Sequence, residues 1–259
     1  MEVFVVHSFA ENGFKGNPAG VCFVDEFPPP EKMRKTAAKA GFSETAFVRR
    51  SGAEFLIRWW TPETEVSLCG HATLAAARMI ERRGLGSGMM FVSPEHKIPA
   101  SVEGDLITMD FPSDRQTKCA EPEGLAEALG ERIIYSGKNS ADYLIELADE
   151  KAVSRLRPDM DKIRALDCRG VIVTSRAERS GYDFVSRFFA PQVGIDEDPV
   201  TGSSHTSLAP YWSEKTGGKK LKGLQLSQRG GVVHTEVCGR IVRIGGRAVF
   251  EKKLVLQGL

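Results

Sequence analysis

The sequence predicts an α+β protein of two pseudo-symmetric lobes, each a curved sheet around a central helix. The first observation behind this prediction is an internal repeat: Phe55–Pro62 (FLIRWWTP) recurs as Phe184–Pro191 (FVSRFFAP), half the 259-residue chain away. The second is a stretch, Leu68–Ile80, that is apolar or small on every face, so a helix there is expected to be buried all round. The third is a series of short strand patterns around it.

A second repeated feature follows each of these strands. In both copies a turn leads to a residue–glycine pair and a helix-compatible run, Cys69–Ala75 in the first half and Thr201–Leu208 in the second. Chance is an alternative, because aromatic strands that end in proline are common. Strand, proline and glycine-opened helix recur in the same order, however, which favours a duplication. Two related halves predict an active site in the cleft where they meet.

The remaining elements of the first half are short. Two early strands are expected, and a first helix is bounded by Pro28-Pro29-Pro30 before it and Gly41 after it. Glu81-Arg82-Arg83-Gly84 gives the buried helix a polar end. The expected elements are strands at Val3–Phe9 and Ala19–Val24 and a helix at Glu31–Ala40.

In the second half, the repeated helix is expected over Gly202–Glu214 and to be short or kinked, because Pro210 lies inside it. Near the end, Gly245-Gly246 between Val237–Ile244 and Ala248–Leu256 predicts a hairpin. With Phe111–Asp114 as the linker, residues 1–112 are expected to form the N-terminal lobe and residues 113–259 the C-terminal lobe. The pattern leaves open a return of the last strand to the first lobe.

Composition excludes several classes of function. The formal net charge of +1 gives no basis for nucleic acid or a membrane surface as partner. No apolar run is long enough to span a membrane, and the first residues are expected to form a strand, not a signal peptide. The five cysteines are scattered without CxxC spacing, which predicts a reducing, cytoplasmic setting without a structural zinc site or disulfide framework. No phosphate-binding or dinucleotide-binding glycine motif is present.

The two glycine-opened helix starts are candidate anion sites. Free N–H groups and the positive end of the helix dipole favour a carboxylate. Gly70 and Gly202 would let the backbone approach a ligand closely. Alternatively, these glycines only permit tight packing.

Glu44 is the candidate proton carrier. It lies in Gly41–Val48 (GFSETAFV), where its neighbours are small or apolar and the chain enters a strand. A carboxylate partly removed from water there would suit proton transfer near neutral pH. The alternative is that Ser43 and Glu44 form a polar turn exposed to water.

Three further side chains lie close to the helix starts. Asp198, ahead of the second helix, is expected either to hydrogen-bond locally or to hold a substrate amine. His71, just inside the first helix, would be a neutral ring able to donate or accept a proton. Cys69 is a possible base at the helix N-terminus, whereas its counterpart Thr201 is not.

Taken together, these motifs make the sequence resemble the PhzF-like (phenazine biosynthesis) family of the diaminopimelate-epimerase-like superfamily. The matching stretches span most of the chain in family order. They are Gly16–Val21, Ser43–Val48, Arg58–Ala76, Asp198–Ser203, Leu208–Trp212 and Gln225–Gly231.

The resemblance implies two lobes, each a barrel-like, mostly antiparallel sheet around a central helix, with the active site between them. It also implies no metal, no organic cofactor and a homodimer. The family's namesake isomerises a dihydro-hydroxyanthranilate, one glutamate moving a proton between ring carbons. Glu44 falls at that position, with His71 and Asp198 at the positions of its helpers. Substrate-binding positions by the same resemblance are Cys69, Gly70, Thr201, Gly202 and Ser203.

We therefore expect a cofactor-independent isomerase that acts on a small amino-substituted or cyclic carboxylic acid. An alternative is an amino-acid racemase or epimerase that uses Cys69 and Glu44, although the superfamily's epimerases use two opposed cysteines and Thr201 stands at the second position. A third is a non-catalytic small-molecule-binding protein of the same fold. The sequence also departs from the family at His7, where an acidic residue is usual.

Overall fold

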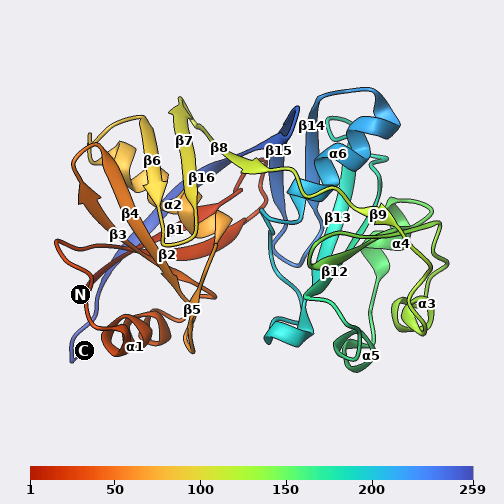
Figure 1. The fold of residues 1–259 in the computed structure, drawn as a ribbon, viewed down its shortest axis with the longest axis horizontal. Coiled ribbons are helices and arrows are strands. Elements are labelled where there is room, and N and C mark those ends of the chain that lie inside the picture. Colours follow the sequence, from red (N-terminus) through yellow and green to blue (C-terminus); the bar gives the residue numbers. More distant parts are fainter. Residues whose placement is uncertain (259) are drawn as a thin grey trace. The chain divides into compact units, whose positions relative to one another are not determined.

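The computed structural model describes residues 1–258 and divides into two compact units (Figure 1). The first unit comprises Met1–Asp110 and the chain from Gly245 onward; the second comprises Phe111–Ile244. The last strand, β16 (Ile241–Val255), therefore begins in the second unit and continues into the first.

The first unit is a closed barrel around one helix. Its strands follow the order β1–β2–β3–β4–β6–β7–β8–β16, and pairing of β1 with β16 closes the ring. All pairs in β1–β4 and β6–β8 are antiparallel except β2–β3 and β4–β6. The elements are β1 (Glu2–Ser8), β2 (Asn17–Phe23), α1 (Pro30–Ala40), β3 (Thr45–Ser51), β4 (Glu54–Trp60), β5 (Glu65–Val66), α2 (Gly70–Arg82), β6 (Gly88–Val92), β7 (Lys97–Glu103) and β8 (Leu106–Pro112).

Helix α2 fills the barrel, as its all-round apolar pattern predicts. Every residue from His71 to Ile80 is buried, and the helix packs against β1, β2, β3 and β7 (Figure 1). Alanines make up much of this run, so strands can approach the helix closely. The indole N–H of Trp59 on β4 donates to Thr73 Oγ1 at 3.1 Å, which ties the helix to the wall of the barrel.

The second unit is also built on a mostly antiparallel sheet, with parallel pairs at β11–β12 and β13–β14. Its strand order is β16–β15–β14–β13–β12–β11–β10–β9, and helix α6 packs against β14 and β15. The elements are β9 (Thr117–Lys118), α3 (Leu125–Leu129), β10 (Tyr135–Lys138), β11 (Asp142–Glu146), α4 (Glu150–Arg155), α5 (Met160–Arg164), β12 (Gly170–Arg176), β13 (Phe184–Phe189), the 3₁₀ turn η1 (Pro191–Val193), α6 (His205–Thr216), β14 (Lys220–Gln225) and β15 (Gly231–Cys238).

Helix α6 differs from its prediction in its first residue and in its length. It begins at His205, not Gly202, because a tight turn precedes it: the His205 N–H donates to the Gly202 carbonyl at 3.0 Å. Pro210 does not shorten the helix. Proline has no N–H to donate to the Thr206 carbonyl, and the Asp114 N–H donates to that oxygen instead, at 3.3 Å.

The predicted hairpin at Gly245-Gly246 is wrong. The turn lies at Gly239-Arg240, where Gly239 adopts φ +66°, and both later glycines lie inside the continuous strand β16. Gly246 is needed there for space, since a Cβ on it would lie 2.4 Å from the ring of the fully buried Phe9.

None of the helices in residues 1–258 is long and apolar enough to cross a membrane.

Candidate functional site

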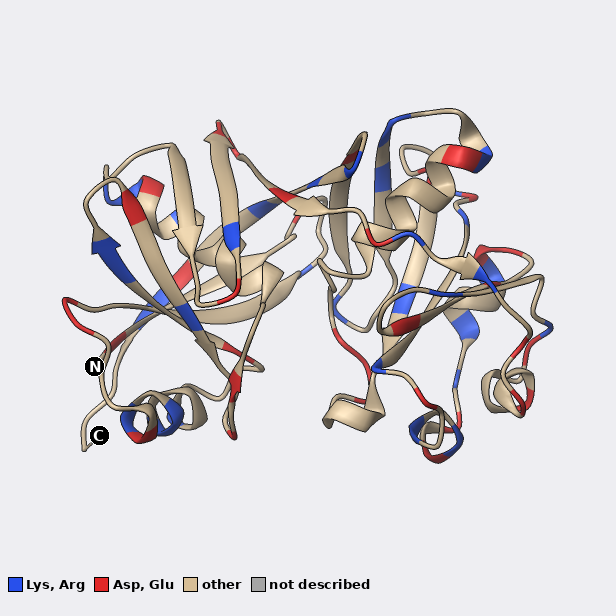
Figure 2. Cartoon of the chain, in the orientation of Figure 1, with Lys and Arg blue, Asp and Glu red and all other residues tan. Residues whose placement is uncertain are grey.

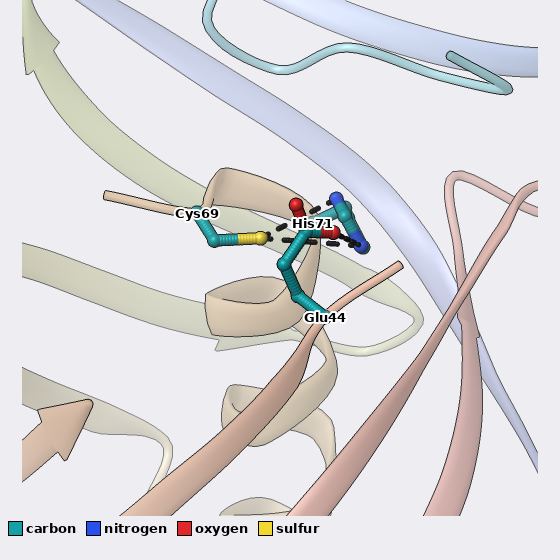
Figure 3. A group of neighbouring side chains, drawn as sticks. All are labelled: Glu44, Cys69 and His71. Carbon is teal, nitrogen blue, oxygen red and sulfur yellow. Dashed lines mark hydrogen bonds and ion pairs between the residues drawn. The ribbon is translucent and has the colours of Figure 1, made fainter. Parts of the chain in front are cut away.

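Three ionisable side chains lie together at the start of α2, and we call Glu44, Cys69 and His71 the first-unit cluster (Figure 3). Glu44 directly precedes β3, Cys69 is the N-cap of α2, and His71 is its second residue. His71 Nε2 lies 3.3 Å from Glu44 Oε2, and Cys69 Sγ lies 3.5 Å from His71 Nδ1. One ligand atom from each residue can be chosen so that all three lie within 4.8 Å of one another.

The backbone around the cluster is held by buried hydrogen bonds. The Gly20 N–H of β2 donates to the Glu44 carbonyl at 3.2 Å. Ser8 Oγ donates to the His71 carbonyl at 2.6 Å, and Thr73 Oγ1 donates to the Cys69 carbonyl at 2.7 Å. The neighbouring strands β1 and β2, together with α2 itself, thus fix the backbone positions of the three residues.

The cluster is largely removed from water. The side chains of Glu44 and His71 are 13% and 7% exposed, and Cys69 is buried. The alternative in which Glu44 stands in a water-exposed turn is therefore wrong. Glu44 Oε2 is buried and accepts no well-aligned hydrogen bond in the described chain, despite its closeness to His71. Such an oxygen keeps a lone pair available for a proton from a ligand.

The N-terminus of α2 adds a positive potential to this site. The side chain of the N-cap Cys69 makes no capping hydrogen bond to the helix backbone, and the first turn contains no acidic residue. The dipole of this 13-residue helix is thus not neutralised by its own first residues. The predicted neighbour Gly70 is the first residue of α2, in the position where a backbone N–H can meet an anion.

In the second unit, Asp198 and Thr201 are in direct contact, and a residue that sequence reasoning missed holds them. Thr201 Oγ1 donates to Asp198 Oδ2 at 2.5 Å. Gln225, fully buried at the end of β14, accepts from the Thr201 N–H at 2.9 Å and donates to the Asp198 carbonyl at 2.9 Å. A polar residue closing the largely apolar end of a strand is the signal that could have identified it.

The other two predicted positions, Gly202 and Ser203, lie in the turn that leads into α6. Ser203 Oγ accepts a hydrogen bond from Arg169 Nη1 at 3.2 Å, which places an unpredicted guanidinium beside this turn. Arg169 is also paired with the buried Asp142. Burial lowers the pKa of Arg169, but the hydrogen bonds and charge of Asp142 raise it further, so the guanidinium stays charged.

His205, the first residue of α6, is a structural histidine. It is fully buried, and its Nδ1–H donates to the Thr201 carbonyl at 2.8 Å. Burial lowers its pKa to about 4, against the opposing effect of that hydrogen bond, so the ring is neutral. It holds the turn that carries Thr201 and Gly202.

The two repeated strands carry matching ion pairs. Arg58 on β4 donates through Nε and Nη2 to both carboxylate oxygens of Glu65, at 2.6 and 2.5 Å. Arg187 on β13 does the same to Glu197, at 2.7 and 2.9 Å. In both pairs the arginine lies on the repeated strand, and the glutamate follows in the chain before the next helix begins. The two halves are therefore alike in these side-chain contacts as well as in sequence.

Charges of both signs are interspersed in each unit (Figure 2). In neither unit of the described chain are the basic residues separated from the acidic ones, the separation that typifies polyanion-binding surfaces.

Comparison with known proteins agrees with this architecture. The family model described as phenazine biosynthesis-like protein matches residues 6–253. An uncharacterised isomerase of Pseudomonas aeruginosa is 43% identical over 252 residues, covering 96% of each chain. The crystal structure of a PhzF-family phenazine biosynthesis protein of Enterococcus faecalis superposes with a TM-score of 0.92 at 36% identity, covering 97% of each chain.

The wider fold is shared with racemases. A probable proline racemase of Agrobacterium radiobacter, only 9% identical, superposes with a TM-score of 0.65 over 98% of this chain and 92% of its own. At that identity the likeness shows the fold alone. Sequence, fold and relatives converge, and the chain is an isomerase that belongs to the phenazine biosynthesis-like (PhzF) family.

Proposed function

We propose that this isomerase moves a proton between carbons of a small carboxylic acid, amino-substituted or cyclic, without a cofactor. The observation that carries the proposal is the first-unit cluster, in which a water-shielded Glu44 carboxylate lies 3.3 Å from the His71 ring at a helix N-terminus. Glu44 takes the proton from one carbon of the substrate and returns it to another.

In this proposal, the α2 N-terminus holds the substrate's carboxylate and so fixes the reacting carbon near Glu44. Such positioning can supply much of the rate enhancement, because well-oriented groups reach effective molarities of about 10⁵–10⁸ M. His71 polarises the substrate and steadies the Glu44 proton. The close contact between the Glu44 and His71 side chains supports these two roles.

We propose further that Asp198, Thr201, Gly202 and Ser203 bind substrate, as the repeated helix starts of the sequence predict. Asp198 would hold an amino or hydroxyl group, and the turn before α6 would face the substrate's polar end. The hydrogen bonds that Gln225 makes with Thr201 and Asp198, and the contact between Thr201 and Asp198, support a fixed, prearranged acceptor.

The geometry of the first-unit cluster favours one base over two. A racemase places its two bases on opposite faces of a carbon, each about 3–3.5 Å away, which separates them by about 6–7 Å. The chosen atoms of Cys69 and Glu44 lie within 4.8 Å, with His71 close to both. A carbon does not fit between them in this arrangement, so the racemase reading is the weaker of the two.

Deuterium incorporation tests the proposal. Candidate small carboxylic acids, among them dihydro-hydroxyanthranilate, diaminopimelate and amino acids, are incubated with enzyme in deuterated water and followed by proton NMR. Loss of a C–H signal or appearance of an isomer is expected with the wild type and not with Glu44→Gln. Isomerisation by Glu44→Gln at the wild-type rate would contradict the role of Glu44.

Three further properties remain proposals from the sequence and the family: internal duplication, a homodimer and a cytoplasmic location. The matching Arg58–Glu65 and Arg187–Glu197 pairs support the duplication. Size-exclusion chromatography with light scattering tests the homodimer, for which a mass near twice 28.4 kDa is expected.

A further inference from the structure

The first-unit cluster has the composition of a metal site as well as that of a proton-transfer site. It offers a thiol, an imidazole and a carboxylate, three ligand types that Zn²⁺ takes in proteins. Elsewhere in residues 1–258 no other group of three His, Cys, Asp or Glu side chains meets the same spacing.

The distances from His71 Nε2 to the other two ligand atoms are close to those of tetrahedral coordination. Zinc bonds of about 2.3 Å to sulfur and about 2.0–2.2 Å to nitrogen or oxygen, at tetrahedral angles, place neighbouring ligand atoms about 3.3–3.6 Å apart. Here His71 Nε2 lies 3.3 Å from Glu44 Oε2 and 3.9 Å from Cys69 Sγ. Small side-chain rotations would bring all three atoms onto one ion.

The surroundings of the Glu44 carboxylate also favour a bound cation. Its Oε2 is buried, directed at the other two side chains, and without a hydrogen-bond partner in the described part of the chain (Figure 3). A buried acceptor of this kind is costly unless something binds it. A substrate proton would satisfy it, and so would a cation.

We propose that the first-unit cluster binds Zn²⁺ reversibly through Glu44, Cys69 and His71, and that the bound ion inhibits isomerisation. The ion would occupy the lone pair that receives the substrate proton, and the fourth coordination position would remain open to water or a substrate carboxylate. A thiolate ligand selects Zn²⁺ over Mg²⁺ and Ca²⁺. The inhibition rests on the proposed function; the binding does not.

Cobalt spectroscopy of the full chain tests the binding without reference to activity. Titration with Co²⁺ should give a thiolate-to-cobalt charge-transfer band in the near ultraviolet and tetrahedral d–d bands in the visible, and Zn²⁺ should displace both. Affinity should fall at lower pH, because the ligands must lose protons to bind.

Variants identify the ligands. Cys69→Ser should abolish the charge-transfer band. Glu44→Gln should keep the band and weaken Zn²⁺ binding at least tenfold, since even outer-shell partners of metal ligands are worth about 10–100-fold. Cys238→Ser, which alters an exposed thiol, is the matched control and should behave as the wild type. Circular dichroism confirms that each variant is folded.

The outcomes separate this inference from the proposed function. No thiolate band in the wild type, or an equal band in Cys69→Ser, overturns the zinc site whatever the enzyme's activity. A zinc site with the expected variant pattern stands even if metal-free enzyme isomerises none of the carboxylic acids. Where a substrate is found, Zn²⁺ should inhibit its turnover and EDTA should restore it; full activity with the site saturated would overturn the inhibitory role.

Discussion

Replacing Gln225 by leucine should release the turn that carries Thr201. The amide of Gln225 accepts from the Thr201 N–H at 2.9 Å, and its Nε2 donates to the Asp198 carbonyl and to Thr201 Oγ1. Leucine has a similar size but no polar atom, so Gln225→Leu removes all three hydrogen bonds without opening a large cavity.

The Thr201 N–H that loses its hydrogen-bond acceptor determines how large the effect of Gln225→Leu should be. Thr201 is buried and this N–H has Gln225 as its partner. A buried donor left unsatisfied costs about 1–3 kcal/mol. At a factor of ten per 1.4 kcal/mol, the amide of Thr201 should exchange its hydrogen about 5- to 150-fold faster, because the turn opens more often.

Hydrogen exchange measured by NMR or by mass spectrometry of peptides that cover the turn is the assay. Gln228→Leu is the matched control, because Gln228 is the exposed glutamine of the same stretch. It should leave the exchange of the Thr201 amide unchanged. Equal exchange rates in Gln225→Leu and the wild type would refute the reasoning that Gln225 holds this turn.

Gly246→Ala should destabilise the protein by about 1–3 kcal/mol in urea unfolding, because the added Cβ would lie 2.4 Å from the Phe9 ring; an unchanged midpoint would contradict this. His205 has a pKa of about 4 in the folded protein, below its unfolded value of 6.5, so acidification favours the unfolded state, which binds the proton first. Stability should therefore fall between pH 6.5 and 4, and His205→Phe should flatten that part of the profile; an equal slope in both proteins would argue against it. Cys69→Ala should reduce turnover modestly if Glu44 is the sole base, whereas complete inactivity in a folded variant would favour two bases.

The parts of the fold that follow from local pattern were predictable. Helix α2 is buried over ten consecutive residues, from His71 to Ile80, because no face of the predicted helix carried a run of polar side chains. The nearness of Cys69 and His71 followed from their positions at one helix start. The small and apolar neighbours of Glu44 at the start of a strand favoured its shielding from water, but they left a water-exposed turn open as an alternative.

The parts that depend on distant contacts were not predictable. Because a turn precedes α6, the helix begins only at His205. This turn is held by Gln225, which lies 24 residues from its partner Thr201 in the sequence. Arg169 meets Ser203 across 34 residues. Gly245-Gly246 has the composition of a turn, but Gly246 makes room for Phe9, whose position no local pattern indicates.

The most direct test of the account is proton NMR in deuterated water with one substrate found in the carboxylic acid screen. The purified wild type is compared with purified Glu44→Gln. The account predicts that the wild type isomerises the substrate and exchanges one carbon-bound hydrogen, and that folded Glu44→Gln binds the same compound but does neither. Exchange and isomerisation by Glu44→Gln at the wild-type rate would contradict the claim that Glu44 carries the proton.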